Sequence, residues 1–321
     1  MNRKECKVKI PGIQDVREAA SRIKPFIHRT PVLTCNAIDS MTGCQVFFKA
    51  ENFQKAGAFK ARGAHNALMA MSDKDASLGV TTHSSGNHAA ALALAARNRG
   101  VDACIVMPSN APMVKRAAVE GYGARIVFCE PTLDAREKTL ARLVQETGAA
   151  VVHPYDDPLV IAGQATAALE LLEDVGDLDM VLAPVGGGGL MSGTAITVRA
   201  LCPAASLVGV EPKGADDAFR SLEQGKLVPS ANPSTIADGL LTSLSPRTFR
   251  ILSRELERIV TVGEDAIRMA LRIIMERMKI VVEPSAAVTL AALLESNFGQ
   301  SGLRVGVILS GGNLELGTFI P

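Results

Sequence analysis

From about residue 45 onward, short runs of β-branched and apolar residues alternate with longer segments rich in alanine and leucine that carry charges at helical spacing. The short runs predict strands at QVFFKA (45–50), GVTTH (79–83), ACIVM (103–107), ARIVF (124–128), AVVH (150–153), MVLAPV (180–185), SLVGVE (206–211) and LRVGVILS (303–310). The longer segments predict helices over 58–71, 87–99, 111–121, 132–146, 158–173, 189–200, 214–223, 263–278 and 284–295. This alternation indicates an α/β fold with parallel, doubly wound sheets.

The spacing of these segments also indicates two domains. Four predicted strands and three predicted helices lie between about residues 78 and 153, enough for a compact unit. We therefore expect a small domain over 78–153, inserted into a large domain formed by 1–77 and 154–321. Ligands of doubly wound sheets bind beyond the carboxyl ends of strands, so the loops directly after strands are the places to search for a site.

Composition narrows the possible functions. With 321 residues, 47% of them hydrophobic, the chain can bury a large core, and its formal net charge of +1 gives no field for holding nucleic acid or an anionic membrane. The charged N-terminus MNRKECKVKI and the short apolar runs argue against a secretory signal or a membrane span. Six scattered cysteines without a CxxC pair are typical of reduced thiols. We therefore expect a cytoplasmic protein that acts on a small molecule.

One lysine has unusual surroundings. In ENFQKAGAFKARGA (51–64), Lys60 follows the apolar Phe59, and most of its other neighbours are small. A lysine in an apolar, open niche has a lowered pKa and is a good amine nucleophile. The alternative is a lysine whose stem packs on apolar residues while its amine reaches solvent.

Three loops that follow predicted strands have compositions suited to ligands. SSGNH (84–88) precedes a helix, whose first N–H groups can hold a carboxylate, although the loop can also be an ordinary helix cap. The tetraglycine at 186–189 lets several N–H groups converge on a phosphate and matches neither GxGxxG nor a P-loop; a flexible turn is the alternative. SGGN (310–313) allows close approach of a ligand and offers the neutral hydroxyl of Ser310.

Acidic residues gather in EPKGADD (211–217). Glu211 ends a predicted strand, and Asp217 lies just inside the next element. Two carboxylates and a loop carbonyl suit a hard cation such as Mg²⁺ or Ca²⁺. The alternative is helix capping by Asp216 or Asp217 beside a solvated Glu211.

Together these features fit pyridoxal 5'-phosphate. An amine such as that of Lys60 can form a Schiff base with this cofactor, and the tetraglycine loop can hold its single phosphate. The SSGNH loop can hold the carboxylate of an amino-acid substrate, and Ser310 can face the pyridine nitrogen. A serine there gives a weaker electron sink than an aspartate, which favours prompt loss of a β-leaving group.

The chain closely resembles the fold-type-II pyridoxal-phosphate enzymes, in the branch of serine/threonine dehydratases, serine racemases and 3-hydroxyaspartate dehydratases. The resemblance runs through ordered motifs from HRTPVL (28–33) to LSGGN (309–313). It implies the tryptophan-synthase β-like architecture, with a small doubly wound domain inserted in a large one, and a homodimer. Because the chain stops eight residues after Asn313, no C-terminal regulatory domain is expected.

The resemblance also implies roles for individual residues. Lys60 corresponds to the Schiff-base lysine, and Ser85 to the serine that acts on the opposite face of the cofactor in serine racemase. The implied cofactor contacts are Phe59, Lys60, Asn87, Gly186, Gly187, Gly188, Gly189, Leu190 and Ser310. The implied substrate contacts are Ser84, Ser85, Gly86, Asn87 and His88, with Arg136 or His153 as the partner of a second carboxylate. The implied site for a divalent cation, Mg²⁺ with Mn²⁺ or Ca²⁺ as alternatives, consists of Glu211, Asp217 and the carbonyl of Ala215.

The activity that this resemblance implies is an ammonia-lyase, which converts 3-hydroxyaspartate, threonine or serine to a 2-oxo acid and ammonia. Ala58 and Ala90 replace the Ser and Gln of the serine racemase pattern, and Tyr155 replaces an Asn near the racemase substrate, which favours a dehydratase. Serine racemase with side dehydratase activity stays open because Ser85 is present. A non-catalytic protein that binds pyridoxal phosphate is the third hypothesis, which the intact catalytic residues disfavour.

Overall fold

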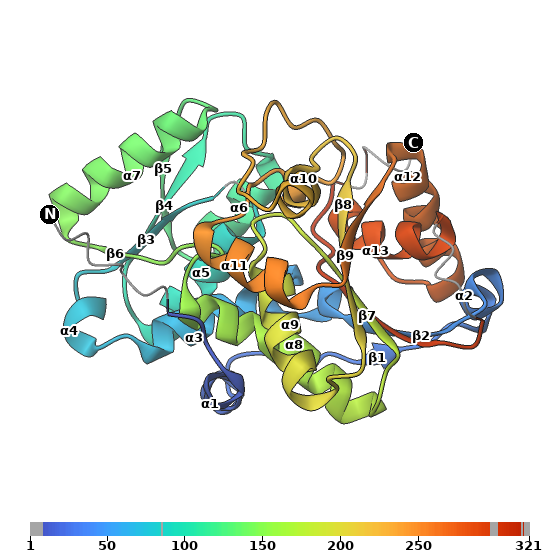
Figure 1. Ribbon diagram of the computed structural model, residues 1–321. Coiled ribbons are helices and arrows are strands. Elements are labelled where there is room, and N and C mark those ends of the chain that lie inside the picture. Colours follow the sequence, from blue (N-terminus) through green and yellow to red (C-terminus); the bar gives the residue numbers. More distant parts are fainter. Residues whose placement is uncertain (1–8, 85, 296–300, 316, 318–321) are drawn as a thin grey trace, which may run out of the picture.

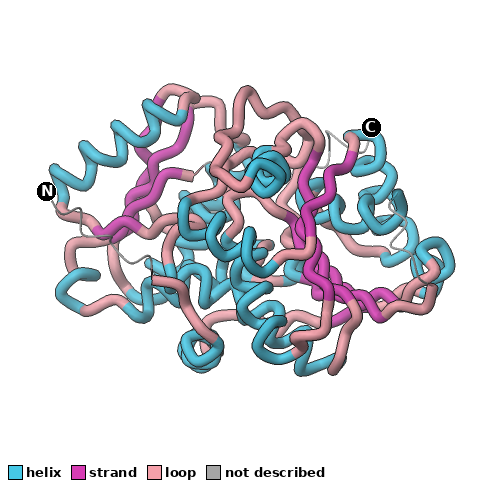
Figure 2. The backbone as a smooth tube through the Cα atoms, viewed as in Figure 1, coloured by secondary structure: helices cyan, strands magenta, loops and turns pink. Residues whose placement is uncertain are grey.

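Two β-sheets and the helices that cover them make up the fold. The computed structural model describes residues 9–84, 86–295, 301–315 and 317. A six-stranded sheet has the order β1-β2-β10-β7-β8-β9, and a four-stranded sheet has the order β5-β4-β3-β6. Figure 1 shows the four-stranded sheet on the left and the six-stranded sheet on the right, with helices packed around both (Figure 2). The predicted α/β fold class is confirmed.

The six-stranded sheet carries most of the core. Its strands are β1 (Val32–Leu33), β2 (Gln45–Ala50), β7 (Met180–Pro184), β8 (Ser206–Pro212), β9 (Arg258–Val262) and β10 (Arg304–Leu309). All neighbouring strands in it are parallel except β1 and β2. In β7, Leu182 packs in one hydrophobic cluster while Val181 and Ala183 pack in another. Successive side chains of a strand point to opposite faces, so both faces of this sheet are buried.

Helices cover both faces of the six-stranded sheet. The helical elements around it are α1 (Ile13–Ile23), α2 (Asn36–Thr42), α8 (Pro158–Val175), α9 (Gly189–Leu201), α10 (Asp217–Gln224), α11 (Pro246–Glu255), α12 (Glu264–Ile273), the π-helical turn η4 (Ile274–Met278), α13 (Pro284–Glu295), and the 3₁₀ turns η1 (Glu51–Phe53), η2 (Lys55–Gly57) and η3 (Asp238–Leu240). Residues of α12 and α13 share a cluster with Leu182, whereas residues of α8 and α9 share one with Val181. The two helix layers therefore lie on opposite sides of the sheet.

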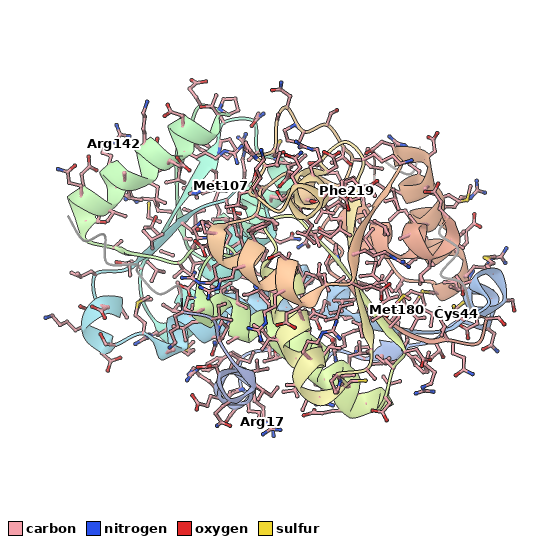
Figure 3. The ribbon with its side chains drawn as sticks, viewed as in Figure 1. Arg17, Cys44, Met107, Arg142, Met180 and Phe219 are labelled. Carbon is pink, nitrogen blue, oxygen red and sulfur yellow. The ribbon has the colours of Figure 1, made fainter. Side chains whose placement is uncertain are left out.

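The four-stranded sheet is parallel throughout. Its strands are β3 (Val80–His83), β4 (Ala103–Pro108), β5 (Arg125–Cys129) and β6 (Ala150–Val151), and the helices near it are α3 (Lys60–Ala70), α4 (Asp73–Ala76), α5 (Asn87–Arg99), α6 (Met113–Gly121) and α7 (Leu133–Thr147). Met107 in β4 and Met180 in β7 mark the cores of the two sheets (Figure 3). The core of the smaller sheet also includes Leu68 of α3 and Val160 of α8. The domain boundaries at 77/78 and 153/154 stay a prediction.

Each predicted segment corresponds to an observed element, and β2, α5 and α13 have the predicted bounds. Strands β1 and β9 and helices α1, α2, α4 and α11 were not predicted. The strand predicted over 150–153 is shorter, since β6 ends at Val151. In the part of the chain that the structure describes, no helix is both long and apolar enough to cross a bilayer.

Glycines allow three helices to pack at very short distance. A Cβ added at Gly163 of α8 would lie 2.6 Å from the Cα of Gly63 in α3. A Cβ added at Gly193 of α9 would lie 2.7 Å from the backbone nitrogen of Ala165 in α8. The backbones of α3, α8 and α9 therefore touch, which fixes the position of α3 and of Lys60 at its start.

We expect the substitution Gly163→Ala to lower the free energy of unfolding by about 1–3 kcal/mol, because the new methyl group would force the α3 and α8 backbones apart. The matched control is Gly121→Ala, in helix α6, where an added Cβ meets nothing within 4 Å. This control should leave stability unchanged or raise it by about 0.4–1 kcal/mol. Urea denaturation measures both, and equal stabilities of the two variants would contradict close packing at Gly163.

Candidate functional site

A cavity of about 540 Å³ lies where strands of both sheets end. Its walls include Ser84 after β3, Gly186 after β7 and Ser310 after β10. The predicted cofactor and substrate residues that line it are Phe59, Lys60, Ser84, Gly86, Asn87, His88, Arg136, Gly186, Gly187, Gly188, Gly189, Leu190 and Ser310. Ser85 lies outside the described residues. Five separate stretches of sequence thus meet around one space.

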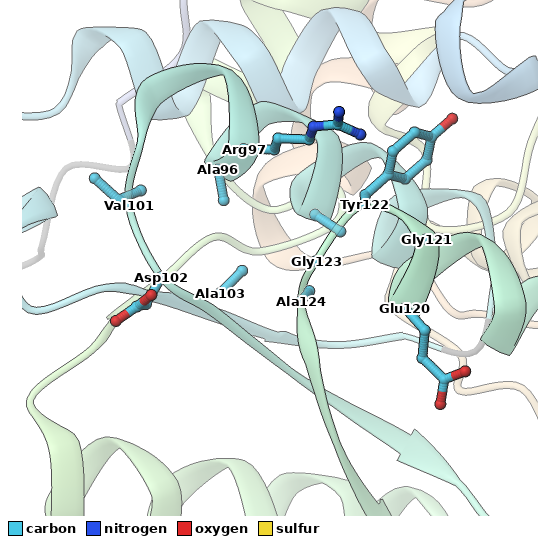
Figure 4. A pocket seen from close by; sticks show the side chains of 11 residues that line it. Ala96, Arg97, Val101, Asp102, Ala103, Glu120, Gly121, Tyr122, Gly123 and Ala124 are labelled. Carbon is cyan, nitrogen blue, oxygen red and sulfur yellow. The ribbon is translucent and has the colours of Figure 1, made fainter.

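A second cavity, of about 430 Å³, lies at the other ends of the strands in the smaller sheet (Figure 4). Residues just before or at the start of β4 and β5, such as Asp102 and Ala124, line it together with Tyr122. None of the predicted site residues lines this cavity, and the two cavities share no lining residue. The candidate site is therefore the first cavity.

Lys60 begins helix α3 and faces the cavity. Its Nζ donates a hydrogen bond of 2.8 Å to the carbonyl of Pro154 and lies 5.1 Å from the centroid of the Phe59 ring. The side chain is half-buried, because it opens to the cavity rather than to the outer surface. Burial lowers the pKa of Lys60 from 10.5 to about 8, against the opposing effect of the Glu283 carboxylate. A lysine with this pKa is a far better nucleophile at neutral pH than an exposed one.

The tetraglycine loop forms an open cradle at the start of helix α9. Gly188 is the residue before the helix and has a φ of 82°, in the left-handed region that favours glycine. A Cβ at Gly188 would lie 2.7 Å from Leu244, and one at Gly187 would lie 2.3 Å from Tyr155. Side chains are therefore excluded, and the N–H groups of the first helical turn face the cavity without intrahelical partners. This cradle fits the phosphate of pyridoxal phosphate.

Ser310 fits the ring of the same cofactor. Its side chain is 2% exposed and lines the cavity. Its hydroxyl oxygen has no hydrogen-bond partner among the described residues. Buried hydroxyls are normally paired, so an unpaired one that borders a cavity indicates a ligand as its partner.

Asn87 is held in one orientation by two neighbours. Its Nδ2 donates to both carboxylate oxygens of Glu283, at 2.8 and 3.0 Å, and its Oδ1 accepts from Asn313 at 3.0 Å. Asn313 also donates to the carbonyl of Ala56, a residue in the lysine loop with a φ of 57°. Burial raises the pKa of Glu283 to about 7, which the hydrogen bond from Asn87 opposes. These hydrogen bonds join the loop after β3, the loop after β10 and the loop that precedes Lys60.

Two groups at the cavity were not predicted from the sequence. One is Glu283, which lies in the stretch ERMKIVVEPSAA (276–287). The other is an ion pair between Lys115 of α6 and Asp238 of η3, both of which line the cavity. Lys115 lies three residues after the stretch IVMPSNAP (105–112), and Asp238 lies in TIADGL (235–240), but neither stretch predicts that the two residues meet.

The structure distinguishes the two candidates for holding a second carboxylate. His153 accepts hydrogen bonds at Nδ1 from the backbone of Tyr155 and Asp156, and burial lowers its pKa to about 4, so the ring is neutral. Arg136 lines the cavity, and its Nε is buried without a partner among the described residues. A guanidinium stays charged at every working pH. Arg136 is therefore the better partner for a carboxylate. His88 is also neutral, since burial lowers its pKa to about 3.

The acidic cluster lies outside this cavity. Glu211 is fully buried and accepts N–H groups from Ala218 and Phe219 at the start of α10, at 3.1 and 2.7 Å. The alternative of a solvated Glu211 beside a capping aspartate is therefore wrong. Burial raises the pKa of Glu211 to about 9 and that of Asp217 to about 6. The backbone N–H groups of Asp217 and Leu244 oppose the rise in the Asp217 pKa, but neither approaches a carboxylate oxygen closely enough for a regular hydrogen bond in the described chain.

A cation would satisfy these carboxylates, since buried charges are normally paired or bound to metal. The described residues contain no group of three or more His, Cys, Asp or Glu arranged for a metal. A site here would thus rest on Glu211, Asp217 and carbonyl oxygens such as that of Ala215.

Comparisons with known proteins identify the family to which the chain belongs. Residues 23–311 match the family model described as "Pyridoxal-phosphate dependent enzyme". The chain is 47% identical over 307 residues to a beta-hydroxyaspartate dehydratase of Paracoccus denitrificans, covering 96% of this chain and 98% of that one. It is 45% identical over 308 residues to an L-threo-3-hydroxyaspartate ammonia-lyase of Saccharomyces cerevisiae, covering 96% and 94%.

A solved structure of maize serine racemase is similar over nearly the whole fold. It superposes with a TM-score of 0.95 at 44% identity, covering 97% of this chain and 96% of that one. The family model spans most of the chain and includes every residue of the cavity that was named above. The protein thus belongs to the pyridoxal-phosphate dependent enzymes, in their fold-type-II branch.

Proposed function

We propose that this protein is a pyridoxal-phosphate dependent ammonia-lyase that converts β-hydroxy amino acids to 2-oxo acids and ammonia, with 3-hydroxyaspartate, threonine and serine as its substrate set. The observation that carries the proposal is one cavity in which the low-pKa amine of Lys60, the glycine cradle and the unpaired Ser310 hydroxyl meet. The names of the relatives support the choice of reaction.

The chain's own residues supply binding and proton transfer. When bound, the cofactor supplies an electron sink for the α-carbon of the substrate. Lys60 Nζ would hold the cofactor covalently until the amino group of the substrate displaces it, and the freed neutral amine would then accept the proton from the substrate Cα. Asn87 is oriented by Glu283 and Asn313 to contact the cofactor's phenolic oxygen. The neutral Ser310 hydroxyl faces the ring nitrogen without adding charge, which favours early departure of the β-hydroxyl.

The substrate lies, in this proposal, between the SSGNH loop and Arg136. Ser84, Gly86, Asn87 and His88 hold its α-carboxylate at the start of α5, where helical N–H groups point outward. Ser85 is proposed to act on the opposite face of the cofactor. We also propose that residues 78–153 close over the substrate as a small domain, which their separate sheet supports.

We propose that Glu211, Asp217 and the carbonyl of Ala215 bind a divalent cation, Mg²⁺ with Mn²⁺ or Ca²⁺ as alternatives. The two unpaired oxygens of the buried Asp217 support this site. The Asp217 carboxylate adds to the cost of ionising Glu211, and a cation would remove that repulsion.

We also propose a cytoplasmic homodimer. The side chains of Phe53 and Val281 are exposed, and the hydrogen bond from Asn52 to the Val281 carbonyl joins their two segments, so we propose this region as the apolar surface for a second copy. Five free cysteines among the described residues support a reducing compartment. Light scattering on the purified holoenzyme measures the oligomeric state.

The substrate assay tests the proposed reaction. Purified holoenzyme is incubated with L- and D-serine, L-threonine and each 3-hydroxyaspartate isomer, with and without Mg²⁺, and 2-oxo acid and chiral composition are measured. We expect 2-oxo acid from at least one substrate, with higher rates in Mg²⁺. No 2-oxo acid from any of them would exclude the lyase, and racemisation faster than elimination on serine would favour serine racemase.

Substitution of Arg136 tests the preference for a dicarboxylic substrate. We expect Arg136→Gln to lower kcat/KM for 3-hydroxyaspartate by about ten- to hundredfold, the value of one charged hydrogen bond, and to change kcat/KM for threonine little. The matched control is Arg142→Gln, on the same helix α7, where the side chain is 66% exposed. An equal loss of kcat/KM for both substrates would show that Arg136 does not bind the second carboxylate.

A further inference from the structure

Tyr155 occupies the space that side chains at the tetraglycine loop would fill. A Cβ added at Gly187 would lie 2.3 Å from Cδ1 and 2.5 Å from Cε1 of the Tyr155 ring. A Cβ added at Gly189 would lie 2.9 Å from the Cβ of Tyr155. Two of the four glycines therefore leave room for the Tyr155 side chain, since any larger residue at 187 or 189 would clash with it. The ring lies directly against the proposed phosphate cradle.

The ring is held in this place from its other side. The His153 ring meets it edge-on, with centroids 4.7 Å apart, and His153 Nδ1 accepts the backbone N–H of Tyr155. The next residue, Asp156, is bound by Arg247 through both its carbonyl and its carboxylate, each at 2.6 Å. The backbone on both sides of the tyrosine is thus fixed, so the side chain has little freedom to leave the loop.

The phenol of Tyr155 is available as a hydrogen-bond donor to a ligand in the cavity. The side chain lines the cavity, and its oxygen makes no hydrogen bond to a described residue. Burial raises the pKa of Tyr155 to about 12, so the phenol keeps its proton at every working pH and can donate to an anion. The nearby carboxylates that act on it, those of Asp156, Asp217 and Glu137, also disfavour its ionisation.

The cradle itself lacks a side-chain donor. Residues 184–190 read PVGGGGL and contain no hydroxyl or cation. Backbone N–H groups supply its hydrogen bonds, and a phosphate has more acceptor sites than one helical turn can fill. A neutral donor beside the loop can complete the coordination without the desolvation cost of a buried charge.

We propose that the Tyr155 phenol donates a hydrogen bond to the phosphate held by residues 186–190. This inference rests on the proposed function, because it takes pyridoxal phosphate as the ligand of the cavity. Tyr155 is then a phosphate-binding residue supplied by the loop after β6, and the glycines at 187 and 189 serve to admit it.

The test compares two ligands that differ only in the phosphate. Apo protein is titrated with pyridoxal phosphate and with pyridoxal, and the visible absorbance of the ligand joined to Lys60 gives each affinity. We expect Tyr155→Phe to lower the affinity for pyridoxal phosphate by about ten- to hundredfold and to leave that for pyridoxal unchanged. The matched control is Tyr122→Phe, since Tyr122 is the chain's other tyrosine and lines the second cavity. It should alter neither affinity.

The outcomes separate this inference from the function on which it rests. Wild-type protein that fails to bind pyridoxal phosphate would overturn the proposed function. If the wild-type protein binds pyridoxal phosphate, two results would overturn the role of the phenol alone. One is an unchanged affinity of Tyr155→Phe for pyridoxal phosphate, and the other is an equal loss of affinity for both ligands. Circular dichroism checks the fold, and Tyr155→Leu, which also removes the hydroxyl donor, is titrated in the same way should Tyr155→Phe not fold.

Discussion

Replacing Lys60 by alanine is expected to abolish the visible absorbance of bound cofactor together with 2-oxo acid formation, while the fold stays intact. The substitution removes the amine that would hold the cofactor and the base that would take the α-proton, so activity should fall by at least about 10²–10⁴-fold. Stability should change by less than about 1 kcal/mol, because Lys60 makes one hydrogen bond, to Pro154, and its amine is desolvated at a cost. Absorbance spectra, the substrate assay and urea denaturation measure the three effects.

The control for this experiment is Lys55→Ala, in the same loop. Lys55 does not line the cavity, so absorbance and activity should both persist. A Lys60→Ala protein that keeps the absorbance would show that the cofactor is joined to a different amine. Loss of the fold in Lys60→Ala would show instead that this side chain has a structural role.

Replacing Arg62 by methionine is expected to lower the free energy of unfolding by about 3–5 kcal/mol. Arg62 is fully buried and binds Glu51 at 2.7 Å and Glu170 at 2.8 Å, and Lys49 binds Glu170 at 2.7 Å. The four side chains form a neutral buried network of two cations and two carboxylates. Without Arg62, the fully buried Glu51 and the largely buried Glu170 would face one lysine, which leaves one negative charge uncompensated. Urea denaturation measures the loss.

The surface offers a matched control for the buried arginine. Arg29 also pairs with two carboxylates, those of Glu173 and Asp174, but its side chain is 52% exposed. Water already solvates these charges, so Arg29→Met should cost less than about 1 kcal/mol. Similar costs for Arg29→Met and Arg62→Met would contradict the view that burial makes the Arg62 network critical.

Sequence patterns predicted the long elements of this fold and missed the short or exposed ones. Strands such as β7 are buried on both faces, so they appear as continuous apolar runs. Strand β1 has two residues and helix α4 has four, too few for a period to be visible. Strand β9, RIVTV, has a β-branched run that could have been found, but it is a half-exposed edge strand after a highly charged helix.

The candidate site was predictable where its residues lie in contiguous loops. The tetraglycine and SSGNH loops follow strands, so topology alone brings them to one edge. The contacts Asn87–Glu283 and Lys115–Asp238 were not predictable, since they join residues 196 and 123 positions apart. Such pairs depend on how α5, α6 and α13 pack, which no local pattern encodes. The position of Tyr155 over the glycines has the same origin.

The order of strands in the larger sheet has a consequence for how the protein is made. Strand β10 (304–309) lies between β2 and β7, and Val307 pairs with both Phe48 and Leu182. During synthesis on the ribosome, β2 and β7 emerge long before β10, so their inner edges have no partner until almost the whole chain has been translated. Exposed strand edges promote aggregation. Nascent chains that stall before residue 304 should therefore depend on chaperones to avoid aggregation. They also cannot yet form the side of the cavity that Ser310 lines.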